Sequence, residues 1–133
     1  MSNILIVEDN PSLNNAYKLI LEKEGHTITV AFNGLEGLEA LDHATPDIIL
    51  LDLLMPKMGG IKFLRKLNSD GKLKADGKKS GKDKQLTIIV LSNLNQDEEV
   101  QQALDLGAYK YILKADTSPR ELAMRVNHLL DRL

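Results

Sequence analysis

The chain has 133 residues, with 17 Lys and Arg against 19 Asp and Glu, a formal net charge of −2, and no cysteine. The length fits one domain, and a hydrophobic fraction of 43% is ordinary for a globular protein. The absence of cysteine excludes disulfides, thiol catalysis, Cys-ligated zinc and iron–sulfur clusters, and is compatible with the cytoplasmic location that we expect. The longest apolar runs are far shorter than the ~20 residues of a membrane span.

Five short apolar segments alternate with segments of helical periodicity. The apolar segments, each predicted as a strand, are Asn3–Val7, Thr27–Phe32, Asp47–Asp52, Leu86–Leu91 and Tyr109–Leu113. After each of them, apolar residues recur at intervals of three and four, which predicts a helix. Asn10-Pro11 and Ser118-Pro119 are typical helix starts, and Gly107 is a typical helix end.

The strand segments have the composition of a buried parallel sheet. Residues 48–51 (Ile-Ile-Leu-Leu) are apolar on both faces, which is typical of a parallel strand covered by helices on each side. Right-handed crossovers then predict an α/β fold of the (βα)5 type, a doubly wound five-stranded parallel sheet.

One segment breaks this alternation. Residues 70–84 contain six Lys, three Asp, three Gly and a single branched apolar residue, so this part of the chain buries too little surface to offset its ordering entropy. We expect a single domain over residues 1–133 with a flexible Lys-rich surface loop at about 70–84. A solvated insertion is the simplest interpretation, and electrostatic contact with an acidic partner or polyanion is the alternative.

Polar side chains follow four of the five predicted strands. Glu8 and Asp9 follow the first strand, Asp52 ends the third, Ser92 follows the fourth, and Lys114 follows the fifth. In an open parallel sheet, ligands bind beyond the carboxyl ends of the strands. Taken singly, each residue has a simpler structural role, such as a turn, a helix cap or a surface charge. Taken together, they indicate one site.

This combination of residues suits metal-assisted phosphoryl chemistry. Carboxylates gathered in one crevice repel each other unless a hard cation such as Mg²⁺ neutralises them. Asp52 is then a candidate nucleophile forming an aspartyl phosphate, with Lys114 and Ser92 as partners of the phosphoryl oxygens. The sequence lacks both G-x-x-x-x-G-K-[ST] and G-x-G-x-x-G, which disfavours a nucleotide site.

The sequence also resembles the receiver domain of two-component response regulators across essentially its whole length. The matching segments are residues 4–10 (ILIVEDN), 52–60 (DLLMPKMGG), 90–92 (VLS) and 107–114 (GAYKYILK). The resemblance is to a stand-alone receiver of the chemotaxis-regulator type. It implies a flavodoxin-like fold with strand order 2-1-3-4-5.

The resemblance also implies a role for each residue of the predicted site. Asp52 matches the phosphoacceptor, which receives a phosphoryl group from a sensor histidine kinase or a phosphotransfer protein. Glu8, Asp9, Asp52 and the backbone carbonyl of Leu54 match the ligands of Mg²⁺, with Mn²⁺ as an alternative. The chain is thus expected to be a signalling module and not an enzyme, apart from its own phosphoryl transfer and dephosphorylation.

Three further residues match the switch of such receivers. Ser92 matches the hydroxyl that moves to the phosphoryl group, Lys114 the lysine that pairs with that group, and Tyr111 the aromatic side chain that then turns inward. This implies a protein-binding surface controlled by phosphorylation. The expected partners are the phosphodonor protein and an unknown target protein, without nucleic acid or membrane, in a monomer or a phosphorylation-dependent dimer. No output domain is expected.

The sequence departs from the receiver pattern in a few places. Ala115 stands where receivers usually have a cis proline, so we expect a trans Lys114–Ala115 peptide bond. Asn93 replaces a usually small residue. Neither Leu54 nor Leu94 can orient an attacking water, which predicts a long-lived phosphoryl group. A phosphorylation-independent scaffold and a flavodoxin-like cofactor binder remain alternatives.

Overall fold

The computed structural model describes residues 2–73, 86–93 and 97–133. The strands are β1 (Asn3–Val7), β2 (Thr27–Ala31), β3 (Ile48–Asp52), β4 (Ile88–Ser92) and β5 (Lys110–Leu113). The helices are α1 (Pro11–Lys23), α2 (Gly34–His43), α3 (Gly60–Ser69), α4 (Asp97–Leu106), α5 (Pro119–Leu130) and the short 3-10 helix η1 (Lys114–Asp116).

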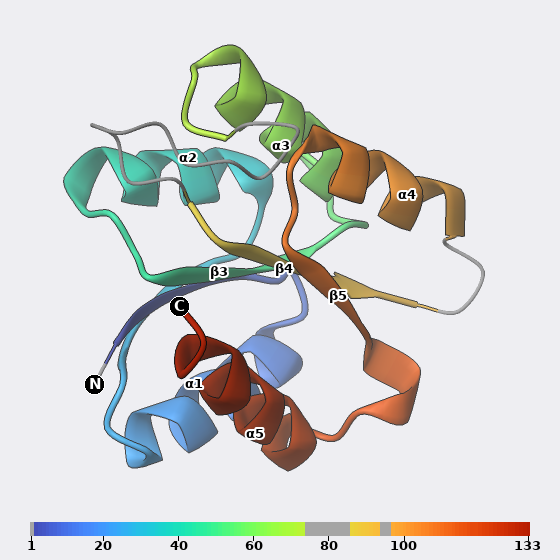
Figure 1. Ribbon diagram of the computed structural model, residues 1–133. Coiled ribbons are helices and arrows are strands. Elements are labelled where there is room, and N and C mark those ends of the chain that lie inside the picture. Colours follow the sequence, from blue (N-terminus) through green and yellow to red (C-terminus); the bar gives the residue numbers. More distant parts are fainter. Residues whose placement is uncertain (1, 74–85, 94–96) are drawn as a thin grey trace.

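The five strands form one parallel sheet in the order β2-β1-β3-β4-β5, which confirms the order implied by the resemblance to receiver domains. The helices α1 and α5 cover one face of the sheet, and α2, α3 and α4 cover the other (Figure 1). Because β1 and β3 lie in the middle with helices on both sides, residues 4–7 and 48–52 are all buried. This double burial is why these strands are continuous apolar runs in the sequence.

Two hydrophobic cores flank the sheet. On one side Tyr17 and Leu21 of α1 pack with Leu122 and Val126 of α5 against the strands. On the other side the apolar faces of α3 and α4, with partly buried residues of α2, pack around Phe63. The layered arrangement fixes the strand ends relative to one another, and these ends carry the predicted site.

Helix starts follow the local signals in the sequence. The side chain of Asn10 accepts a hydrogen bond from the backbone N–H of Leu13, and Ser118 caps α5 in the same way through Glu121. Asn33 caps α2 by accepting from the N–H of Glu36. Such caps satisfy backbone donors that have no partner inside the helix.

Several strands begin or end one or two residues from their predicted positions. The fourth starts at Ile88 rather than Leu86 and extends to Ser92, and the second ends at Ala31. Pairing with the neighbouring strands sets these limits, as in the register of Ile88 opposite Ile49. None of the helices in the described part of the chain is long and apolar enough to cross a membrane.

One residue near the start of the predicted surface loop at 70–84 is buried in the structure. Leu73 is only 1% exposed and belongs to the same core cluster as Leu86 and Phe63. The composition of the segment does not reveal this packed side chain, because it averages one apolar residue with many polar ones. Positions 74–84 of this predicted loop lie outside the described residues.

Candidate functional site

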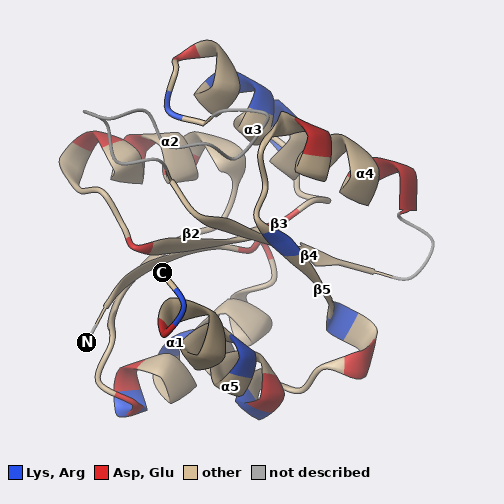
Figure 2. Ribbon diagram, in the orientation of Figure 1, with Lys and Arg blue, Asp and Glu red and all other residues tan. Residues whose placement is uncertain are grey.

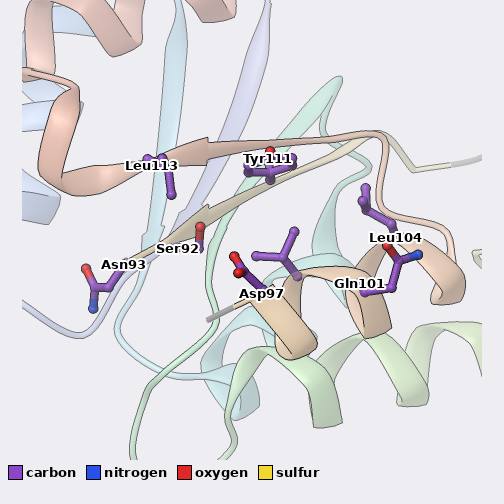
Figure 3. A pocket seen from close by; sticks show the side chains of 8 residues that line it. Ser92, Asn93, Asp97, Gln101, Leu104, Tyr111 and Leu113 are labelled. Carbon is purple, nitrogen blue, oxygen red and sulfur yellow. The ribbon is translucent and has the colours of Figure 1, made fainter. Parts of the chain in front are cut away.

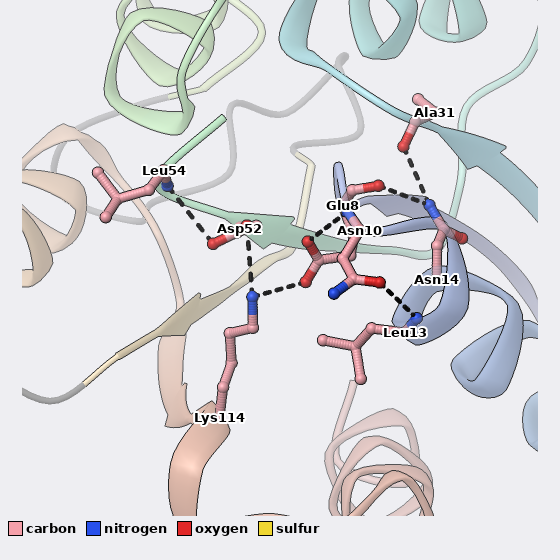
Figure 4. Close-up of polar contacts among 8 residues, drawn as sticks. All are labelled: Glu8, Asn10, Leu13, Asn14, Ala31, Asp52, Leu54 and Lys114. Atoms are coloured by element: carbon pink, nitrogen blue, oxygen red, sulfur yellow. Dashed lines mark hydrogen bonds and ion pairs between the residues drawn. The ribbon is translucent and has the colours of Figure 1, made fainter. Parts of the chain in front are cut away.

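The predicted site residues meet at the carboxyl edge of the sheet. Glu8 and Asp9 directly follow β1, and Asp52 and Ser92 are the last residues of β3 and β4. Lys114 opens η1 directly after β5. Because all strands are parallel, their ends converge, and Figure 4 shows the side chains of Glu8, Asp52 and Lys114 pointing toward one another. The predicted convergence of these side chains at one edge of the sheet is thus seen in the structure.

Lys114 forms two ion pairs in this site. Its Nζ lies 2.7 Å from Oε1 of Glu8 and 3.4 Å from Oδ2 of Asp52 (Figure 4). The side chains of Glu8 and Asp52 are 0% and 3% exposed, and that of Lys114 is 15% exposed. At such low exposure a charge needs partners, because water screens little and breaking such a contact leaves a buried charge uncompensated.

The backbone around Glu8 is held by several hydrogen bonds. Its N–H donates to the carbonyl of Ala31 at 3.0 Å, and its carbonyl accepts from Nδ2 of Asn14 at 3.0 Å. Oε2 of Glu8 accepts from the N–H of Asn10 at 3.2 Å. Oε2 of Glu8 thus has a hydrogen-bond partner, Oε1 has the ion pair with Lys114, and the end of β1 is tied to the end of β2.

Three carboxylates at this edge fit a divalent cation. Glu8, Asp9 and Asp52 each offer one oxygen, and these oxygens lie within 4.8 Å of one another. Two of these residues are buried and Asp9 is half-buried, so water does little to screen their repulsion. A hard ion with oxygen ligands, such as Mg²⁺, is the group that this donor set suits.

The environment of Asp52 makes its carboxyl group harder to ionise than an ordinary aspartate. Burial and the charge of Glu8 together raise the pKa of Asp52 to about 7, against the opposing charge of Lys114. Burial lowers the pKa of Lys114, but the hydrogen bond to Glu8 and the charges of Asp52 and Glu8 outweigh that effect and raise it. Lys114 thus stays a cation.

Ser92 and Tyr111 line the same cavity. Oγ of Ser92 is buried and has no hydrogen-bond partner among the described residues. The cavity of about 210 Å³ lies between β4, α4 and β5, and both Ser92 and Tyr111 line it (Figure 3). Tyr111 is 50% exposed, so its ring is on the surface in this structure. The site therefore combines a hydroxyl without a partner, an adjacent cavity and an exposed aromatic side chain.

Leu54 and Ala115 lie next to the site in the chain, and only their backbones matter for it here. The N–H of Leu54 lies 3.4 Å from Oδ1 of Asp52, while its side chain is exposed. No cis peptide occurs in the described chain, so the predicted trans bond between Lys114 and Ala115 is confirmed.

Two buried polar residues of α1, Asn14 and Tyr17, also belong to the surroundings of the site and are not among its predicted residues. Asn14 is buried and donates to the carbonyls of both Glu8 and Ala31. Tyr17 is buried, and its pKa is raised to about 12 by burial and by the charges of Glu8 and Asp52. The helical spacing of apolar residues in α1 places Tyr17 on the face that packs against the sheet, but that spacing carries no signal for the hydrogen bonds of Asn14.

The chain matches a known protein family. The family model described as the response regulator receiver domain matches residues 4–127. The response regulator SaeR of Staphylococcus epidermidis is 35% identical over 135 residues, and the match covers 100% of this chain and 52% of SaeR. The DNA-binding response regulator MtrA of Mycolicibacterium smegmatis is 34% identical over 129 residues, covering 97% of this chain and 50% of MtrA.

Structural similarity gives the same result. The receiver domain of the Francisella response regulator 1452 superposes with a TM-score of 0.80 at 29% identity, covering 99% of this chain and 98% of that domain. The chain spans about half the length of the curated relatives it matches. On the family model and this similarity, the chain belongs to the response regulator receiver domain family.

Proposed function

We propose that this receiver accepts a phosphoryl group on Asp52 and thereby switches a protein-binding surface. The observation that carries the proposal is the convergence of Glu8, Asp9, Asp52 and Lys114 at one edge of the sheet. A sensor histidine kinase or a phosphotransfer protein is the phosphodonor, and the target is a further protein. Both remain proposals for this chain, since its relatives are about twice as long.

In the proposed transfer, the phosphorus–nitrogen bond of a phosphohistidine breaks and a phosphorus–oxygen bond to the Asp52 carboxylate forms. The electron pair of the broken bond stays with the imidazole nitrogen. Glu8, Asp9, Asp52 and the Leu54 carbonyl are the groups to hold Mg²⁺, which supplies charge neutralisation for the phosphoryl oxygens. Lys114 adds a positive charge directly beside Asp52.

After transfer, the phosphoryl group brings a charge of about −2 and new acceptor oxygens. Ser92 has a hydroxyl without a partner and Tyr111 lines the adjacent cavity, so both have room to rearrange toward a second state. The new charge then shifts the equilibrium between two arrangements of β4, α4 and β5. Because Leu54 offers no side-chain group to orient water, we expect a long-lived phosphoryl group.

Intact-mass analysis tests the proposal. The protein is incubated with acetyl phosphate or phosphoramidate and Mg²⁺, and we expect a gain of one phosphoryl group. The gain should vanish in Asp52→Asn and on chelation of the metal, and persist in Asp42→Asn, which makes the same change on the exposed surface of α2. Absence of any gain would instead support the phosphorylation-independent scaffold.

A further inference from the structure

The helices α3 and α4 carry charges of opposite sign. In α3, Lys62, Arg65 and Lys66 are all exposed, and the helix contains no acidic residue. The helix α4 contains four acidic residues and no basic one. These acidic residues are Asp97, Glu98, Glu99 and Asp105. Figure 2 shows the division, with blue segments on α3 and red segments on α4.

The two helices lie side by side and in register. Both follow a strand of the same parallel sheet, and they run in the same direction along one of its faces (Figure 1). Near their carboxyl ends, Nδ2 of Asn68 in α3 donates to the carbonyl of Leu106 in α4 at 3.2 Å. Each helix has 10 residues, so the basic and the acidic surface have the same length, about 15 Å.

The charges of α3 and α4 do not neutralise each other within one molecule. Lys66 forms its ion pair with Asp70 at the end of its own helix, at 3.3 Å, and Gln101 donates to Asp105 at 2.9 Å. Within the described parts of the chain, no ion pair joins a basic residue of α3 to an acidic residue of α4. Both surfaces therefore present their charge to a second molecule.

We propose that this face forms a weak dimer of the unphosphorylated protein, in which α3 of each copy contacts α4 of the other. A two-fold axis that runs parallel to the helices and between them places each basic helix opposite an acidic one. One face then complements itself, and both contacts form at once. A two-fold axis across the helices would instead place α3 on α3 and α4 on α4, where like charges repel.

Electrostatic attraction is the main stabilising force in this dimer. Ion pairs between exposed side chains each contribute little, and salt screens them. Two helices of about 15 Å also cover less area than the roughly 800 Å² that each partner buries in a stable complex. We therefore expect self-association at high protein concentration and low salt, with a dissociation constant that rises at least several-fold as salt is added.

Sedimentation analysis of charge-reversed variants tests the dimer. The α3 variant carries Lys62→Glu with Arg65→Glu, and the α4 variant carries Glu98→Lys with Asp105→Lys. At low salt we expect the wild type to self-associate and each variant to stay monomeric, because like charges then face each other. A monomeric wild type, or a variant that self-associates as strongly as the wild type, would overturn the proposal. Retention of a monomeric wild type on heparin would assign α3 to a polyanionic partner instead.

Mixing the two variants tests the arrangement of the helices. Opposite charges face each other again in both contacts of the mixed pair. We therefore expect a fluorescently labelled α4 variant to bind the α3 variant about as tightly as the wild type binds itself. Restored binding also shows that both variants are folded. Absence of binding in the mixture would overturn the proposed arrangement.

A control variant separates this contact from attraction by net charge. Lys18→Glu with Lys23→Glu in α1 gives the same net charge as the α3 variant. It should self-associate like the wild type but should not bind the labelled α4 variant, whose two helices are both basic. Equal binding of this control and of the α3 variant would overturn the proposal. All measurements use unphosphorylated protein, so the outcome is independent of the proposed phosphoryl transfer.

Discussion

Asp52 makes the stability of the protein depend on pH. Its carboxyl has a pKa of about 7 in the folded protein, against 3.8 for the unperturbed group. The folded state thus binds this proton more tightly than the unfolded state, so stability falls as the pH rises from about 4 to about 7. The full penalty above pH 7 is at most roughly 4 kcal/mol. The ionised Asp52 carboxylate, buried beside Glu8, therefore destabilises the metal-free protein.

Asp52→Asn should therefore stabilise the metal-free protein. Asparagine cannot ionise, so we expect a higher melting temperature than wild type, with a difference that is small near pH 4, grows to pH 7 and then levels off. Thermal melts in EDTA at several pH values measure this. Mg²⁺ should reduce the difference, because it stabilises only the ionised site. A variant less stable than wild type at pH 8 would contradict the expectation.

Ser92 is a second residue whose environment lowers the stability of the unphosphorylated protein. Its buried hydroxyl has no partner among the described residues, and such a group costs roughly 1–3 kcal/mol. Ser92→Ala should leave the denaturant midpoint unchanged or raise it. The same variant should still gain the phosphoryl group, but the NMR signals of Tyr111 should no longer shift on phosphorylation. A clear loss of stability would show that the hydroxyl has a structural partner.

At the scale of elements, the start of α3 controls the position of Asp52. A Cβ at Gly60 would lie 2.7 Å from the carbonyl oxygen of Asp52 and 2.8 Å from Cα of Leu53. Both are backbone atoms, so the connection between β3 and α3 would have to shift. The close approach of α3 to the end of β3 is therefore possible only with glycine.

Gly60→Ala should destabilise the protein despite the better helix propensity of alanine. Propensity favours alanine by about 1 kcal/mol, but overpacking against backbone costs roughly 1–3 kcal/mol. We expect a net loss in urea unfolding together with slower phosphorylation, because Asp52 moves. Ser69→Ala at the exposed end of the same helix should change stability by less than about 0.5 kcal/mol. Equal stability of both variants would refute this account.

The elements themselves could be predicted because buried parallel strands are continuous apolar runs. The first and last residues of β4 could not be predicted in this way, because they depend on hydrogen bonding with β3. The candidate site followed from the topology, which brings Glu8, Asp52 and Lys114 to one edge. The unequal ion pairs of Lys114 and the contacts of Asn14 depend on distances between elements remote in sequence, which periodicity does not contain.

On the scale of the whole molecule, charge is strongly segregated along the chain. Positions 57–84 contain ten basic and three acidic residues, against seven and sixteen in the remainder. In the described part, Lys57, Lys62, Arg65 and Lys72 are exposed, and Lys66 pairs with Asp70 at 3.3 Å. Figure 2 shows basic residues on α3 and acidic residues on the neighbouring α4. Although the net charge of the chain is −2, the exposed face of α3 is therefore cationic.

This segregation predicts binding to an anionic matrix by a protein that is itself acidic. Charges interact over about 8–10 Å in ordinary buffers, so a matrix senses the local face of α3 rather than the net charge. We expect retention on a heparin column at low salt. Lys62→Glu with Arg65→Glu should elute at clearly lower salt than a control with Lys18→Glu and Lys23→Glu, which carries the same net charge on α1. Identical elution would mean that the matrix does not contact α3, and that the basic helix is only a solvated surface.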